Sequence, residues 1–159
     1  MSLDAVAAAA KVSKPTLYRR WESKADVATA ALRTLQIAEM PVNTGSTKGD
    51  LTRALENFSR SLLRPNGMAL IGTVLAEEQH TPDLLRLFRE RLVTPRRNLI
   101  RETLERGVAS GELRSGASLD AAANMLVGAI YARYLVASRI PPGFAREVVE
   151  TLWAGLARQ

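Results

Sequence analysis

Apolar side chains at helical spacing, interrupted by proline and glycine, are the feature that most limits the possible folds of this chain. Apolar residues recur three and four positions apart in nearly every segment, and no stretch of useful length alternates as a half-buried strand does. Helix-breaking residues separate these segments, at Pro41, Pro65-Asn66-Gly67, Pro82 and Pro141-Pro142-Gly143. The sequence therefore predicts an all-α fold.

Two places along the chain carry further predictions about its organisation. The segment PVNTGSTKGD, residues 41–50, has the composition of a loop and is the best candidate for a domain boundary. We therefore predict two domains, 1–40 and 41–159. The long amphipathic segment 83–110 contains Pro95, and since proline removes a backbone donor we expect a kinked helix there.

Composition excludes several classes of protein. The chain has 159 residues and is 47% hydrophobic, enough for a sizeable core, and it contains no cysteine. Its one histidine, His80, lies beside Glu77 and Glu78, which is too few ligands for a metal cluster. With no glycine-rich phosphate loop either, we predict no metal, no cofactor and no enzyme activity. No apolar run approaches the roughly 20 residues needed to cross a bilayer, so we expect no membrane partner and a cytoplasmic protein.

Positive charge is concentrated at the start of the chain. The formal net charge is +6, and residues 1–24 contain five cations and two acids, which gives half of that total. All five of these cations lie in KVSKPTLYRRWESK, residues 11–24. A basic segment is compatible with nucleic acid, but a solvated basic surface is the alternative that charge alone leaves open.

The spacing around this segment favours a helix-turn-helix. An alanine-rich helix from Ser2 is interrupted at residues 11–13, and Ser13 can cap a second helix with Pro15 in its first turn. Leu17 and Trp21 can turn inward as an i,i+4 pair, which leaves a basic outer face able to enter the major groove. Ser23 and Asp26 form a capping box for a third helix, where Lys24 and backbone N–H groups can hold a phosphate.

The stretch DAVAAAAKVSKPTLYRRWESKADVATAAL, which begins at Asp4, resembles the helix-turn-helix of the TetR family of transcriptional repressors, and this resemblance covers residues 3–32. A looser resemblance continues through RRNLIRETLERGVASGELR, LVGAIYARYLV and TLWAGLAR. The resemblance implies that Lys14, Pro15, Thr16 and Tyr18 face DNA and that Tyr18 and Lys24 grip phosphates. The full set of predicted DNA-binding residues is Ser13, Lys14, Pro15, Thr16, Tyr18, Arg19, Arg20 and Lys24. Leu17 and Trp21 match core positions.

Members of the family normally carry one more helix before the one that begins near Ser2. The sequence opens without it, so we expect Val6, Leu17 and Trp21 to lack part of their cover. We also expect the helix-turn-helix to be less stable by itself and DNA affinity to be reduced.

Two less detailed predictions concern the C-terminal segments. In the family, the last two helices pair with those of a second copy, which implies a homodimer interface at Leu126, Ala129, Leu152, Trp153 and Leu156. An effector pocket for a small apolar or amphipathic molecule is predicted at Phe58, Leu62, Met68, Ile71, Leu75, Phe88, Met125 and Tyr131. The alternative for both sets is that these side chains only fill the protomer's own core.

The leading hypothesis is a dimeric regulator that binds a double-stranded DNA operator as a repressor and is released by a small-molecule effector. The alternative is a helical module that binds a ligand or a protein and no longer binds DNA.

Overall fold

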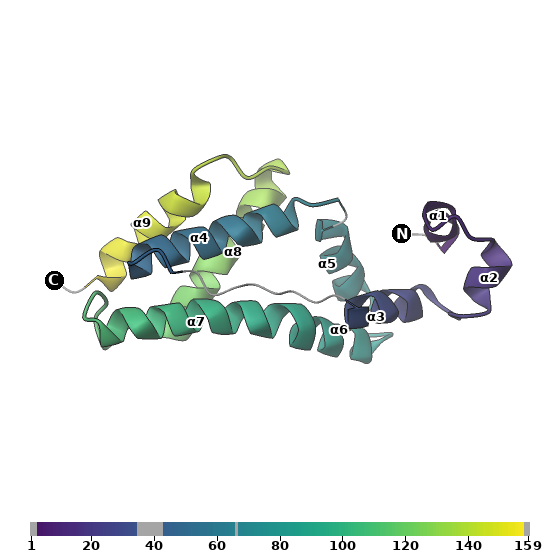
Figure 1. Ribbon diagram of the computed structural model, residues 1–159, viewed down its shortest axis with the longest axis horizontal. Helices are drawn as coiled ribbons and strands as arrows, with labels where there is room; N and C mark the ends of the chain where they lie inside the picture. The colour runs from purple at the N-terminus through teal and green to yellow at the C-terminus, as the bar shows by residue number, and fades with distance from the viewer. Residues whose placement is uncertain (1–2, 35–42, 66, 158–159) are drawn as a thin grey trace. The chain divides into compact units, whose positions relative to one another are not determined.

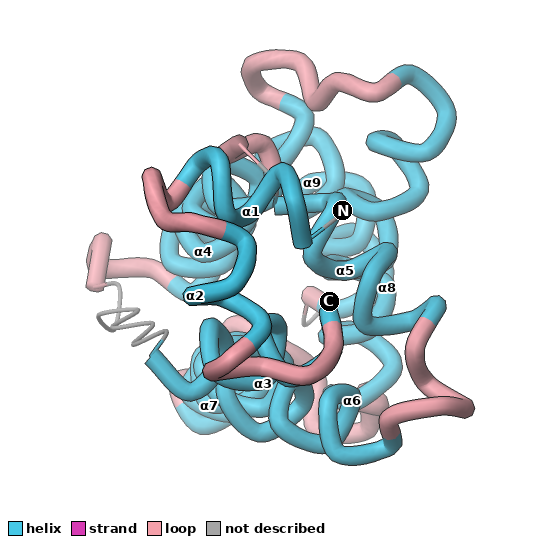
Figure 2. The backbone as a smooth tube through the Cα atoms, turned by 90° about the vertical axis from the view of Figure 1, so that its right-hand side faces the viewer, coloured by secondary structure: helices cyan, strands magenta, loops and turns pink. Residues whose placement is uncertain are grey.

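The computed structural model describes residues 3–34, 43–65 and 67–157, and all its extended regular elements are helical. Figure 2 shows these residues without a strand, although Leu113 and Ala157 form an isolated antiparallel bridge. The all-α prediction is confirmed. The elements, labelled in Figure 1, are α1 Leu3–Ala9, α2 Lys14–Tyr18, α3 Lys24–Thr34, α4 Thr47–Leu62, α5 Gly67–Ala76, α6 Pro82–Phe88, the π-helical turn η1 Arg89–Val93, α7 Thr94–Ala109, α8 Leu119–Ala137 and α9 Phe144–Leu156.

The chain forms two compact units. The first contains Met1–Ala38 and Asn66–Pro95, and the second contains Glu39–Pro65 and Arg96–Gln159. These units divide the chain differently from the predicted functional domains 1–40 and 41–159, which stay a prediction about function.

The first unit has two apolar clusters. In one, α1 packs on α2 through Leu3, Ala7 and Leu17, with Val6, Trp21 and Val27 partly buried around them. The other joins α3 and α5 to α6, and its buried members are Ala28, Val74, Leu84, Leu85, Leu87, Phe88 and Leu92. Helix α3 contributes to both clusters, through Val27 and Ala28, and so links the helix-turn-helix to the rest of this unit.

The second unit is built around α4, which packs against α8 and α9, while α8 also packs against α9. Leu55 of α4, Leu104 of α7, and Leu126 and Ile130 of α8 are completely buried. The long helices α4, α7, α8 and α9 are visible in Figure 1. This unit therefore buries aliphatic side chains from helices far apart in the sequence.

Helix α4 begins earlier than predicted, because residues 41–50 are not all loop. The helix starts at Thr47, and the Ser46 side chain caps it by accepting from the Gly49 N–H at 3.1 Å. A cap that satisfies one of the free N–H groups of the first turn favours a helix start at this position. Residues 41 and 42 lie outside the described residues, as does Ser2, the predicted cap of the first helix.

Pro95 affects its helix through the turn that precedes it. The helix continues through this region without a clean break, as α6, η1 and α7, and in η1 the Thr94 N–H donates to the Arg89 carbonyl five residues earlier. Proline cannot donate and its ring crowds the carbonyl four residues before it, so a wider turn accommodates it.

A buried polar network fixes the start of α4 in the second unit. The Asp50 carboxylate accepts from the Thr44 N–H at 2.6 Å, from the Thr44 hydroxyl at 2.8 Å and from Arg106 Nη2 at 3.0 Å. The Thr47 hydroxyl donates to Glu112 Oε1 at 2.7 Å. These contacts connect the loop before α4 to α7 and to the turn after it.

Candidate nucleic-acid interface

The turn between α1 and α2 depends on an unusual backbone conformation at Lys11. Lys11 has φ 54°, in the left-handed region, and its N–H donates to the Ala8 carbonyl at 3.1 Å. The Val12 N–H donates to the Ala7 carbonyl at 3.0 Å. This pair of bonds is the Schellman motif, which ends α1 sharply and satisfies its last carbonyls. Lysine is an uncommon residue here, because its Cβ is crowded where glycine would be relaxed.

Ser13 begins α2 as predicted. Its backbone is extended, its Oγ accepts from the Thr16 N–H at 3.4 Å, and it lies 2.8 Å from Thr16 Oγ1. Pro15 occupies the first turn, where a missing N–H has no cost. Arg19 Nη2 donates to Thr16 Oγ1 at 3.5 Å, at the limit of a hydrogen bond. Ser13, Thr16 and Arg19 therefore form one exposed chain of polar contacts along α2.

Lys14 has an acidic partner that the sequence analysis did not identify. Its Nζ lies 2.8 Å from Asp4 Oδ2 of α1, and both side chains are more than half exposed. The hydrogen bond from the Lys14 ammonium to the Asp4 carboxylate, with their opposite charges, raises the pKa of Lys14 above its ordinary value. The pair connects the two helices of the helix-turn-helix on its exposed side.

The inward and outward residues of α2 separate as predicted. Leu17 is 3% exposed and Tyr18 is 50% exposed, so the helix buries one side chain and presents the next. The lack of cover expected for Leu17 is therefore wrong, whereas Val6 and Trp21 are partly exposed. The Arg20 guanidinium lies 5.0 Å from the centre of the Trp21 ring, a cation–π contact that directs Arg20 along the protein surface.

The start of α3 has a complete capping box. The Ser23 N–H donates to Asp26 Oδ2 at 2.9 Å, and the Asp26 N–H donates to Ser23 Oγ at 3.1 Å. The backbone N–H of Asp26 is thus already occupied by a protein acceptor and is not available to a phosphate. The side chain of Lys24 lies outside the described part of the structure, so its predicted phosphate contact stays a prediction.

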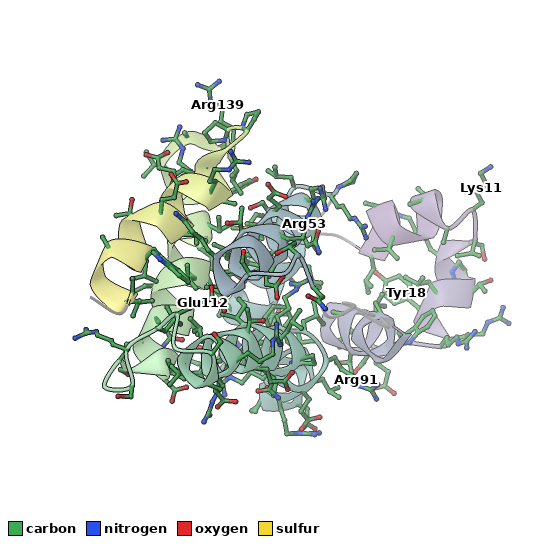
Figure 3. The ribbon with its side chains drawn as sticks, turned by 60° about the vertical axis from the view of Figure 1, so that its left-hand side comes forward. Lys11, Tyr18, Arg53, Arg91, Glu112 and Arg139 are labelled. Carbon is green, nitrogen blue, oxygen red and sulfur yellow. The ribbon has the colours of Figure 1, made fainter. Side chains whose placement is uncertain are left out.

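Apart from the buried Leu17, residues 13–20 are therefore exposed, and Lys14, Arg19 and Arg20 give this surface its positive charge. Figure 3 shows the Lys11 side chain extending away from the ribbon at the turn, a position the sequence analysis did not include among the candidates. Asp4 was also missed, because a contact between helices depends on the geometry of the turn and leaves no local signal.

The predicted effector residues lie in both units. In the second, Phe58 and Leu62 are buried, and the Phe58 and Tyr131 rings meet edge to face with centres 5.2 Å apart. Burial raises the pKa of the Tyr131 hydroxyl, and the positive charge of Arg96 acts in the opposite direction. Met125, also in the second unit, is 59% exposed.

Four of the effector candidates belong to the first unit. Phe88 is buried there, and Ile71 packs against the same cluster. Met68 is partly buried, whereas Leu75 is 56% exposed. The eight predicted residues are thus divided equally between the two units, and the pocket stays a prediction.

The predicted interface residues differ in their exposure. Leu126 and Leu156 are buried within the second unit, whereas Ala129, Leu152 and Trp153 are partly exposed. The most exposed large apolar side chains among the described residues are Leu135 and Val136, near the end of α8. An interface on these helices would therefore use α8 and α9 through side chains other than Leu126 and Leu156.

Comparison with known proteins decides the family. The family model described as the tetracyclin repressor-like C-terminal domain matches residues 41–152, and the model of bacterial regulatory proteins of the tetR family matches residues 1–31. The chain belongs to the TetR family of transcriptional regulators. Members of this TetR family are DNA-binding proteins and are in general not enzymes.

Individual relatives agree with this assignment to the TetR family. An HTH-type transcriptional regulator of Mycobacterium tuberculosis is 34% identical over 142 residues, which cover 89% of this chain and 69% of the relative. The DNA-binding transcriptional repressor TetR of Mycobacteroides abscessus is 32% identical over 117 residues, covering 70% and 59%. The crystal structure of the TetR family transcription regulator SCO0332 superposes with a TM-score of 0.68 at 26% identity, covering 99% of this chain and 87% of that one.

Within the part of the chain that the structure describes, every helix is too short or too polar to cross a membrane.

Proposed function

We propose that this TetR family protein is a dimeric repressor that binds a double-stranded DNA operator through α2 and is released by a small-molecule effector. The observation that carries the proposal is the capped α2, which buries Leu17 and exposes Lys14, Thr16 and Tyr18. The repressor role is supported by the name of the M. abscessus relative. Binding to the chromosome would place the protein in the cytoplasm of a bacterial cell.

The roles we assign follow from position on α2. The first residues of a recognition helix reach base edges, so Lys14 and Thr16 are assigned to the major groove, with Pro15 beside them. Tyr18 and Lys24 are assigned to phosphates, as is Arg19. Ser13 positions the helix through its cap, and Arg20 reaches DNA only if it leaves the Trp21 ring. Residues 1–40 are thus the proposed DNA-binding domain.

Dimerisation matters for DNA binding because it fixes the distance between the two recognition helices. A two-fold axis places two recognition helices about 34 Å apart, one turn of DNA. Residues 41–159 supply the proposed interface from α8 and α9, with Ala129, Leu152 and Trp153 as partly exposed members. Gly128 on α8 is exposed, and a Cβ there would meet no atom of the protomer within 4 Å, so a second helix can approach closely.

The effector is proposed to be apolar or amphipathic, because the pocket candidates are nearly all apolar. Its binding releases DNA only if its affinity differs between the DNA-binding form and the released form. Phe58, Leu62, Tyr131 and Met125 are the candidates from the second unit, and Met68, Ile71, Leu75 and Phe88 those from the first.

DNA binding is tested with duplexes selected from a random library by the wild-type protein. Lys14→Ala, Thr16→Ala and Tyr18→Phe should each lower affinity in a gel-shift series, by about tenfold for Lys14→Ala, the typical value of a good base contact. Arg139→Ala, an exposed cation in the loop after α8, is the matched control and should bind as wild type does. A folded dimer that binds no duplex at low salt would favour the alternative, a helical module that binds a ligand or protein.

The interface is tested with Gly128→Arg. Arginine at this position meets open space in the protomer but blocks a helix packed against it, so sedimentation velocity should show a monomer with an unchanged helical spectrum. Gly116→Arg, at a loop glycine that is equally open, should stay dimeric. A dimeric Gly128→Arg protein would move the proposed interface away from α8.

A further inference from the structure

The ion pair between α1 and α2 involves the residue that opens the proposed recognition helix. Lys14 Nζ is 2.8 Å from Asp4 Oδ2, with 61% of the lysine and 54% of the aspartate side chain exposed. Lys14 is the first residue of α2, and residues at this end of a recognition helix are those that reach base edges. A proposed DNA contact is therefore already held by an acid of the same chain before DNA arrives.

This pair can be exchanged for another partner at low cost. Both groups are exposed, so water and salt screen their attraction, and such surface pairs contribute little to stability. Breaking the pair on DNA has a second consequence, because it leaves the Asp4 carboxylate unpaired near an anionic backbone. A compensating contact is thus needed before Lys14 moves.

Operator and random DNA differ in whether they supply that contact. The major groove presents base acceptors, such as guanine O6 and N7, in a pattern fixed by the sequence. A matching operator offers acceptors where the Lys14 ammonium can reach them, and a random duplex on average does not. Exchange of Lys14 from Asp4 to DNA is then favourable on the operator and unfavourable elsewhere.

We propose that Asp4 is a positioning residue that holds Lys14 away from non-specific DNA and releases it to a matching base pair. The inference rests on the proposed function, because it requires α2 to enter the major groove. Asp4 acts through Lys14 and touches no base in this scheme, so removal of Lys14 removes the effect of Asp4 on the salt dependence of binding.

Fluorescence anisotropy on two duplexes, one selected by the wild-type protein and one random, tests this over a series of KCl concentrations. Asp4→Asn should raise affinity for the random duplex about three- to fivefold, the size of a surface ion pair, and for the selected duplex by at least as much, because operator binding no longer breaks the pair. The salt dependence on the random duplex should become steeper by about 0.9, because the freed Lys14 neutralises one more phosphate.

Three further variants separate this role from plain charge repulsion. Asp4→Glu keeps a carboxylate and should restore the wild-type salt dependence on the random duplex. Glu22→Gln removes an exposed acid from the same segment that has no ion pair within the described residues, and should affect both duplexes by one factor. In a Lys14→Ala background, Asp4→Asn should no longer change the salt dependence.

The outcomes that overturn the inference are distinct. An unchanged salt dependence on the random duplex for Asp4→Asn would show that Asp4 acts only as a negative charge, and the proposed function would stand. Failure of the wild-type protein to select any duplex would overturn the proposed function and this inference together.

Discussion

The helix-turn-helix and the second unit are stabilised in different ways. Around Leu17 the buried cluster is small, and the polar contacts of α2, such as Lys14 with Asp4, lie at exposed positions. In the second unit, Asp50 and Thr47 are buried and form polar contacts with α7 and the turn after it. Solvent and DNA can compete for the first kind of contact and not for the second. The proposed recognition surface is thus free to exchange partners, whereas the proposed dimer scaffold is fixed.

The largest expected effect comes from Leu55→Ala in the second unit. Leu55 is completely buried in α4, so its truncation should lower the free energy of unfolding by about 2–5 kcal/mol. Leu17→Ala, in the smaller cluster, should reduce DNA affinity strongly and lower the main unfolding transition less. Urea unfolding followed by circular dichroism, with anisotropy on a selected duplex, measures both quantities.

Leu63→Ala is the control for this comparison. Leu63 follows α4 and is 45% exposed, so the same truncation should change the unfolding free energy by about 0.5 kcal/mol or less. A Leu17→Ala protein that loses as much global stability as Leu55→Ala would show that the two regions unfold together, and the contrast between them would be wrong.

Residue types at short spacing in the sequence were enough to predict part of the fold and part of the candidate site. The all-α fold, the Ser13 cap and the Ser23–Asp26 capping box all follow from residue type at short spacing, and the structure confirms them. The predicted start of α4 was wrong, because Gly49 and Asp50 are residue types typical of loops. Asp50 is in fact buried by contacts with Thr44 and the distant Arg106.

Contacts between helices could not be predicted from residue types at short spacing in the sequence. The Asp4–Lys14 pair joins two helices across a turn in which Lys11 adopts a left-handed backbone, a conformation that few lysines have. Leu126 and Leu156 illustrate a second limit: helical spacing identifies an apolar face but does not say whether the same protomer or a second copy covers it.

A smaller effect is expected when Asp50 loses its charge. Burial opposes ionisation of this carboxyl, but hydrogen bonds from Thr44 and Arg106 outweigh it and hold the pKa of Asp50 below its usual value. Asp50→Asn should therefore lower the free energy of unfolding at neutral pH by about 1–3 kcal/mol. Chemical unfolding of both proteins across the acidic range measures this difference.

The pH dependence of that difference has a definite sign. Because the folded-state pKa of Asp50 is depressed, its stabilisation is fully present above the unfolded value of about 3.9. It is lost as the pH falls through the folded-state pKa, so wild type and Asp50→Asn should converge in stability in strong acid. Asp83→Asn, whose partner Arg86 is also exposed, is the control and should cost little at any pH. A constant difference at all pH values would contradict the assignment.

The smallest expected effect concerns two residues with a left-handed backbone conformation, one at a helix end in each region. Lys11 follows α1 with φ 54°, and Ser138 ends α8 with φ 51°, where its N–H donates to the Tyr134 carbonyl at 2.7 Å. Glycine relieves the crowding of Cβ in this conformation but adds freedom to the unfolded chain, so each change to glycine should stabilise its region by about 0.5–1 kcal/mol.

Hydrogen exchange at the Val12 and Ser138 amides measures the two regions separately. Lys11→Gly should slow exchange at Val12 alone if the helix-turn-helix opens independently, and Lys11→Ala, which keeps the crowding, should not. Equal slowing at Ser138 would mean that one opening exposes both regions, and the helix-turn-helix would then be as firmly held as the scaffold.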